Sequence, residues 1–92
     1  MANEHSNDKH IEVAVVTTSG RYPNTGTDRV AVNQPISVVL KKAAKELNIV
    51  DTTNWVARVG NNEIDPAKNY EENSLSGTVT IDYGPREGGG GA

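Results

Sequence analysis

The stretch QPISVVLKKAAKELNI, residues 34–49, holds the clearest periodic pattern in the sequence. Its apolar residues recur at intervals of three and four, at Ile36, Val39, Leu40, Ala43, Ala44 and Leu47. This spacing places them on one face of a helix with 3.6 residues per turn, and the lysines of the stretch fall on the outer side. The stretch therefore predicts one amphipathic helix that must bury its apolar face against another element.

Residues at both ends of this stretch predict where the helix begins and ends. Pro35 suits the first helical turn, where its missing N–H costs nothing. Either Asn33 or Gln34 is then the cap: asparagine is chemically the better cap, whereas Pro35 at the first helical position favours Gln34. Asn48 is expected to close the helix in a left-handed conformation.

Segments on either side of the helix alternate between apolar and polar residues, which indicates strands. Before the helix, strands are predicted at residues 10–18 and 27–33, joined as a hairpin by the turn-forming segment 19–26. After it, residues 54–64 predict a strand, a turn and a short strand, and residues 78–84 predict a fifth strand. The predicted fold is α+β, with one helix packed across a mixed sheet of four to five strands.

The same alternation predicts which side chains fill the core. Val30 and Val32 are expected on the inner face of the second strand. Trp55 alternates with Ala57 and Val59, and the sequence has a single tryptophan and no phenylalanine. We therefore expect Trp55 in the core rather than at an interface, because few other large residues can fill the thin core of a small domain.

Composition excludes several classes of protein. The chain has 92 residues, which suffices for one small domain, and it has no cysteine, so it offers no disulfide, thiolate zinc site or thiol nucleophile. The net charge is −3 and charges of both signs are interspersed, which argues against a nucleic-acid-binding face. No apolar run approaches the roughly 20 residues of a membrane span. We expect a cytoplasmic monomer without membrane or nucleic-acid contacts.

Candidate catalytic and metal-binding groups are weak. His5 and His10 lie in or beside a polar N-terminal arm and have no third ligand, so solvated histidines are the favoured interpretation over a metal site. Glu71 and Glu72 form an acidic pair in a polar connection, where a solvated charge run is commoner than a catalytic pair. The serines have no histidine partner. The sequence therefore predicts neither an enzyme nor a metal or cofactor site.

The sequence closes with GPREGGGGA, residues 84–92. We divide the chain into a disordered polar arm (1–9), a folded domain (10–84) and a flexible glycine-rich tail (85–92). Glycines lack Cβ atoms, so such a tail can enter a narrow channel of another protein. The alternative is a linker or a cloning scar, because GGGGA also resembles a flexible linker.

The combination resembles ubiquitin and its bacterial relatives over roughly residues 10–91. The resemblance rests on the hairpin IEVAVVTT and DRVAVN, the helix QPISVVLKKAAKEL, the segment WVARVGNNEIDPAKNYEENSLSGTVTIDYG and the glycine tail. It implies a ubiquitin-like β-grasp fold. The chain is most similar to small ubiquitin-like proteins of bacterial operons that also encode an activating enzyme, a conjugating enzyme and a JAB-type metallopeptidase.

This resemblance implies a protein modifier that is made as a precursor. The peptidase would cut between Gly91 and Ala92, so that the matching diglycine, Gly90 and Gly91, becomes the end of the chain. The Gly91 carboxylate would be adenylated with ATP, passed as a thioester to partner cysteines and joined to an amine of a target protein. All catalytic groups would belong to the partners, in agreement with a chain that lacks cysteine.

The resemblance also indicates a surface on which this chain departs from ubiquitin. Ubiquitin binds receptors through an apolar patch, and the matching positions here are Arg58 and Asp82, both charged. Val56 is the remaining candidate for an exposed apolar side chain. In the tail, Pro85, Arg86 and Glu87 replace the basic residues of ubiquitin, so a cognate enzyme must recognise a different sequence. We take Val56, Arg58, Asp82 and Arg86 as the candidate partner surface, one that ubiquitin receptors should not bind well.

Two alternatives share this fold. The chain could be a sulfur carrier whose terminal glycine becomes a thiocarboxylate, but such carriers usually finish at the glycine, and Ala92 argues against this. It could also be a non-covalent binding module in which the tail is a spacer. Deletion of residues 88–92 separates the classes, because it leaves a binding module intact and abolishes the function of a modifier or carrier.

Overall fold

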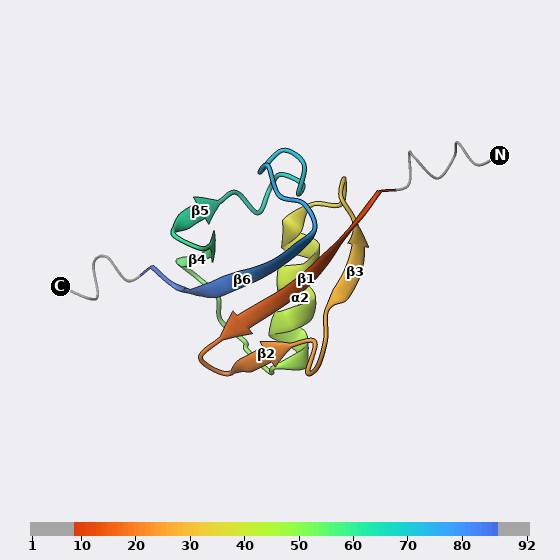
Figure 1. Ribbon diagram of the computed structural model, residues 1–92. Coiled ribbons are helices and arrows are strands. Elements are labelled where there is room, and N and C mark those ends of the chain that lie inside the picture. The colour runs from red at the N-terminus through yellow and green to blue at the C-terminus, as the bar shows by residue number, and fades with distance from the viewer. Residues whose placement is uncertain (1–8, 87–92) are drawn as a thin grey trace.

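The computed structural model describes residues 9–86. In this range six strands form a single sheet, and one helix packs across one face of it (Figure 1). In chain order they are β1 (His10–Thr17), β2 (Gly20–Tyr22), β3 (Asp28–Ala31), α2 (Ile36–Glu46), β4 (Trp55–Val59), β5 (Asn62–Ile64) and β6 (Thr78–Pro85). The predicted α+β class, with a mixed sheet and one helix, is therefore confirmed.

The central strands of the sheet are β1 and β6, which run parallel. Their register pairs Val13 with Val79 and Val15 with Ile81, and all four side chains are buried. On its other edge β6 pairs antiparallel with β4, which pairs antiparallel with β5. The last described strand therefore lies inside the sheet, and its final residues, 83–85, are paired with β4.

The sheet edge beside β1 differs in detail from the prediction. The sequence predicts a turn over residues 19–26, but β2 forms within this segment and pairs with residues 15–17 of β1. β2 ends at Tyr22, because the next residue, Pro23, has no N–H to donate to a strand partner. β3 then pairs with residues 10–13 of the same β1 edge. β2 and β3 thus pair with different halves of the same edge of β1. The described part of the chain therefore has six strands where the sequence predicted four to five.

The N-terminus of α2 is stabilised by contacts that the sequence does not reveal. The prediction of Asn33 or Gln34 as the cap is wrong: Pro35 occupies the cap position, and no side chain bonds to the helix there. The N–H groups of residues 36 and 37 instead donate to the carbonyl oxygens of residues 68 and 66, at 3.1 and 2.9 Å. A loop distant in the sequence thus supplies the acceptors that a cap would otherwise provide.

The apolar face of α2 and its C-terminus follow the prediction. Ile36, Val39, Leu40 and Ala43 are buried against the sheet. Asn48 has a φ of 59°, which confirms the expected left-handed residue after the helix. Its N–H donates to the Lys45 carbonyl oxygen, so one of the last free carbonyl groups of the helix is satisfied.

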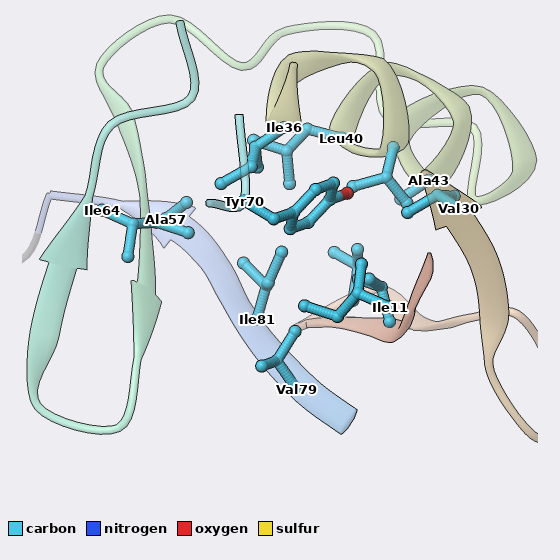
Figure 2. Close-up of a cluster of buried hydrophobic side chains, with 13 residues drawn as sticks. Ile11, Val30, Ile36, Leu40, Ala43, Ala57, Ile64, Tyr70, Val79 and Ile81 are labelled. Carbon is cyan, nitrogen blue, oxygen red and sulfur yellow. The ribbon is translucent and has the colours of Figure 1, made fainter. Parts of the chain in front are cut away.

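The core lies between α2 and the sheet, with Tyr70 at its centre (Figure 2). It consists of Ile11, Val13, Val15, Val30, Ile36, Val39, Leu40, Ala43, Ala57, Ile64, Tyr70, Val79 and Ile81. Figure 2 shows the Tyr70 ring between helix residues Ile36 and Leu40 on one side and Ile81 of β6 on the other. Val30 is buried and Val32 packs against the core, which confirms that both face inward.

The prediction that Trp55 packs in the core is wrong. Trp55 is half-buried and does not belong to the core cluster, although Ala57 on the same face of β4 does. The helix packs closest to β1 and β2, at the other side of the sheet, so it does not cover the start of β4. The Trp55 ring instead meets the Tyr83 ring of β6 edge to face, with centroids 5.0 Å apart.

The Tyr70 hydroxyl is a buried polar group that has no hydrogen-bond partner within the described part of the chain. Burial, followed by the negative charge of Asp28, raises the pKa of Tyr70 to about 12. An unfolded chain ionises near the ordinary tyrosine pKa of about 10. Between pH 10 and 12 the unfolded state therefore loses this proton first, so the stability that depends on the neutral hydroxyl is present below pH 10 and is lost as the pH rises through 12.

The substitution Tyr70→Phe is expected to raise the free energy of unfolding at neutral pH by about 1 kcal/mol, because it removes a buried hydroxyl that lacks a partner. The variant should also lose less stability than the wild type between pH 10 and 12. Urea unfolding followed by Trp55 fluorescence measures both effects. The matched control is Tyr22→Phe, which removes a hydroxyl that donates to Asp28 Oδ2 at 3.0 Å and should lower stability. Equal losses in the two variants would contradict the prediction.

Candidate functional site

The described chain ends at Arg86, which is bound to the residue before β4 and to a residue of β5. We call Arg86, with its partners Asn54 and Glu63, the tail root. The Arg86 backbone N–H donates to the Asn54 carbonyl oxygen at 3.0 Å. Its guanidinium donates to both carboxylate oxygens of Glu63 on β5, with Nη2 3.0 Å from Oε2 and Nη1 3.4 Å from Oε1. The chain is thus fixed to the sheet through Arg86, the residue before Glu87 and the four glycines.

The ion pair between Arg86 and Glu63 orients the chain more than it stabilises the fold. The two side chains are 57% and 46% exposed, and ion pairs of this kind contribute at most about 1 kcal/mol. The fork geometry of a guanidinium on a carboxylate nevertheless fixes the direction of both side chains. Glu63 was absent from the candidate surface because it is 23 residues from Arg86 in the sequence, and only the pairing of β6, β4 and β5 brings the two together.

Arg58 and Asp82, two residues of the predicted partner surface, lie opposite each other. The register pairs Arg58 of β4 with Asp82 of β6 on one side and with Glu63 of β5 on the other. Together with Arg86, these residues form a charged row of alternating sign on the face of the sheet away from α2. Opposite charges at facing strand positions attract. This face of the sheet is therefore charged at Arg58, Glu63 and Asp82.

Val56 does not belong to an exposed surface, and its assignment as an exposed apolar residue is wrong. Only 8% of Val56 is exposed. The register puts it opposite Gly84, on the outer face of β4 between the positions of Asn54 and Arg58. The ion pair of Arg86 joins the strands on either side of β4, so the arginine stem crosses this part of the face. Long basic side chains cover apolar neighbours in this way while the charged end stays in water.

A shallow depression of about 290 Å³ adjoins the charged row at the ends of β1 and β6. It is lined by Val16, Thr17, Thr18, Arg58, Asp82, Tyr83 and Gly84. Hydroxyl, guanidinium and carboxylate groups surround it, so it offers hydrogen bonds and charges rather than a deep apolar cavity. Such a site suits the rim of a protein–protein contact better than the binding of a small molecule.

Several residues that the sequence singled out are outside the part of the chain that the structure describes. Gly90, Gly91, Ala92 and His5 lie outside the described residues. Among residues 9–86, no group of three or more His, Cys, Asp or Glu side chains is placed to hold a metal ion. Within the same range, no helix is long and apolar enough to cross a membrane.

The acidic pair at residues 71 and 72 contains one structural residue. Glu72 Oε1 accepts the Asn69 N–H at 2.9 Å, and the Glu72 N–H donates to Asn69 Oδ1 at 2.7 Å. This reciprocal pair of bonds fixes the turn that contains Tyr70, whose side chain fills the core. Glu72 therefore has a local role in the loop, beyond that of a solvated charge.

The topology defines the fold. A mixed sheet whose first and last strands lie parallel at its centre, crossed by one helix, is a β-grasp. Solved structures with this fold identify it further as ubiquitin-like. A designed protein based on ubiquitin aligns over 90% of this chain and 96% of its own, with a TM-score of 0.65 and 23% identity.

Two natural comparisons agree with this fold. The N-terminal ubiquitin-like domain of the 4931431F19Rik protein aligns over 86% of this chain and 77% of that chain, with a TM-score of 0.61 and 15% identity. A structure titled as molecular mimicry of SUMO that promotes DNA repair aligns over 85% of this chain and 96% of that chain, with a TM-score of 0.56 and 15% identity. No protein-family model and no curated protein matches the sequence. At these identities the likeness establishes a ubiquitin-like fold.

Proposed function

We propose that this chain is a ubiquitin-like protein modifier that is conjugated to target amines through the carboxylate of Gly91. The observation that carries the proposal is the tail root. A central strand of a ubiquitin-like domain runs to Arg86, which is bound to Asn54 just before β4 and to Glu63 of β5, and the next residues are Glu87 and four glycines. A folded domain followed, after Glu87, by four residues without Cβ atoms suits a partner that must reach a terminal carboxylate through a narrow channel.

The proposed chemistry begins on the precursor. A JAB-type metallopeptidase hydrolyses the peptide bond between Gly91 and Ala92, which frees the Gly91 carboxylate. In the activating enzyme, a carboxylate oxygen of Gly91 attacks the α-phosphorus of ATP, and pyrophosphate leaves. A cysteine thiolate of that enzyme then attacks the acyl adenylate and AMP leaves, so that a thioester forms.

The remaining steps also use partner groups. The acyl group passes by thiol exchange to a conjugating enzyme, and the amine of a target lysine attacks the thioester carbonyl. An isopeptide bond forms and the thiol is released. Because the chain has no cysteine, both thioesters need thiols from the partners. The role of the domain is to be recognised and to present Gly91 at a fixed distance from its surface.

The position of Arg86 gives a direct test of conjugation. Arg86 is the last basic residue of the sequence, so trypsin cuts after it and leaves residues 87–91 on the acceptor lysine of any conjugate. We expect tryptic peptides from cells that naturally make this chain to contain lysines bearing Glu-Gly-Gly-Gly-Gly. Mass spectrometry of the digested proteome identifies them.

A variant of the chain serves as the control for this assignment. Arg86→Lys keeps a basic residue at the tail root and should leave the same remnant, whereas digestion of the unaltered chain at lysines alone cuts after Lys68 and lengthens the remnant to residues 69–91 on the same target lysines. A free chain that gains sulfur in place of oxygen at Gly91, without remnants on other proteins, would show a sulfur carrier instead. An unmodified chain that keeps Ala92 and leaves no remnants would contradict both and support a non-covalent module.

A further inference from the structure

An aromatic pair lies beside the tail root on the helix-facing side of the sheet. The rings of Trp55 on β4 and Tyr83 on β6 meet at an interplanar angle of 78°, and both side chains are half-buried. The sequence has one tryptophan and three tyrosines, and each tyrosine lies in the core cluster or packs against it. Trp55 alone among these aromatic residues stays outside the core. A large aromatic side chain left at the surface is a common contact residue in protein interfaces.

The pair is close to the chain that any tail-processing enzyme must hold. The register places Trp55 directly opposite Pro85, and residues paired in this way have Cα atoms about 4.5–5.5 Å apart. Arg86 follows immediately and is bound to the Asn54 carbonyl oxygen. Trp55 therefore lies on the strand next to Pro85 and Arg86, the last residues that the structure describes.

The length of the tail limits where an enzyme can bind. Gly91 is five residues after Arg86 (91 minus 86), and an extended chain of this length reaches at most about 18 Å. A stable protein interface covers roughly 800 Å² on each partner, which is a disc of roughly 16 Å radius. An enzyme whose active site holds Gly91 is therefore close enough to the domain for its contact area to include the aromatic pair.

We propose that Trp55 and Tyr83 form the docking contact for the ATP-dependent enzyme that adenylates the Gly91 carboxylate. This inference rests on the proposed function and names the surface that function uses. Like the peptidase, the adenylating enzyme binds a chain that is not covalently attached to it, so contacts with the folded domain add to its affinity, whereas a conjugating enzyme receives the chain as a thioester. Trp55 supplies the apolar contact area on the helix-facing side, while the ion pair of Arg86 with Glu63 holds the start of the tail from the opposite face of the sheet.

The test uses the full chain ending at Gly91, so that removal of Ala92 is not required. The probe is a desalted extract of cells that naturally make the chain, supplied with ATP and labelled pyrophosphate. Because adenylation releases pyrophosphate, its reversal places label in ATP. The rate that depends on added chain is measured against chain concentration. We expect Trp55→Ala to raise the half-saturating concentration about 10- to 100-fold, the range of an interface hot spot, and to leave the maximal rate unchanged.

Tyr22→Ala is the matched control, because Tyr22 is also a half-buried aromatic residue that packs against the core, but it lies on β2 at the far edge of the sheet. It should leave the half-saturating concentration unchanged. Trp55→Phe should restore most of the affinity lost in Trp55→Ala. If Trp55→Ala matches the wild type, or if both alanine variants lose affinity equally, the docking proposal is overturned while the proposed function stands. If the wild type gives no exchange, the proposed function fails, and the docking contact fails with it.

Discussion

Deletion of residues 90–92 is expected to abolish conjugation, with no remnant detected on any target protein. The deletion removes the diglycine and leaves Gly89 as the last residue. The chain then ends nearer to the fixed Arg86, so its carboxylate falls short of the position of Gly91 by up to about 7 Å of extended chain. Catalysis is sensitive to misplacement of about 1 Å, so neither the adenylate nor the thioester should form.

Deletion of Ala92 alone is the matched control for this experiment. It yields the chain that the peptidase would release, so conjugation should continue and should no longer need the peptidase. Both chains keep all the residues that form the fold and should unfold at the same urea concentration. Remnants from the chain that ends at Gly89 would refute Gly91 as the reactive end, and loss of remnants from the chain lacking only Ala92 would refute the precursor.

Ile81→Ala is expected to cost about 3 kcal/mol of unfolding free energy, which is a large fraction of the stability of a domain this small. Ile81 is fully buried at the centre of β6, opposite Val15 of β1 and beneath Tyr70 in the core. Its replacement removes three carbon atoms from a site enclosed by the helix and the sheet. The variant should therefore populate the unfolded state measurably at 37 °C, as urea unfolding and thermal unfolding followed by Trp55 fluorescence would report.

Thr80→Ala provides the control on the same strand. Thr80 is exposed and points to the opposite face of the sheet, so its replacement should change stability by no more than about 0.5 kcal/mol. Ile81→Ala should also lower conjugation, because β6 carries the tail, whereas Thr80→Ala should not. A loss of less than 1 kcal/mol in Ile81→Ala would mean that the core relaxes around the cavity, contrary to the packing seen here.

Several features of the fold could be predicted because they depend on neighbours in the sequence. The apolar residues of α2 recur with the helical period, so the buried face formed by Ile36, Val39 and Leu40 follows from spacing alone. The left-handed Asn48 follows from the conformational preference of asparagine after a helix. The alternation in β1 and β6 likewise predicts which residues face inward.

Other features required the tertiary structure, because the groups involved are distant in the sequence. The first N–H groups of α2 bind carbonyl oxygens near residue 67, about 30 residues later, so local cap rules failed at Asn33 and Gln34. Trp55 has the inward-facing position on its strand, yet the helix packs elsewhere on the sheet. Alternation assigns a residue to a face of the sheet, and only the packing of the next layer decides whether that face is covered.

Some features of the candidate site likewise follow from the sequence alone, and others depend on the tertiary structure. The sequence by itself determined the glycine tail, the absence of cysteine and the charges at Arg58 and Asp82, because these depend only on residue identity. Only the tertiary structure decided that Val56 is buried, that Glu63 holds Arg86, and that Trp55 with Tyr83 lies beside the point where the tail begins. The physical reason is strand order: β6, last in the sequence, inserts between β1 and β4, and this pairing brings residues from three separate segments to one end of the sheet.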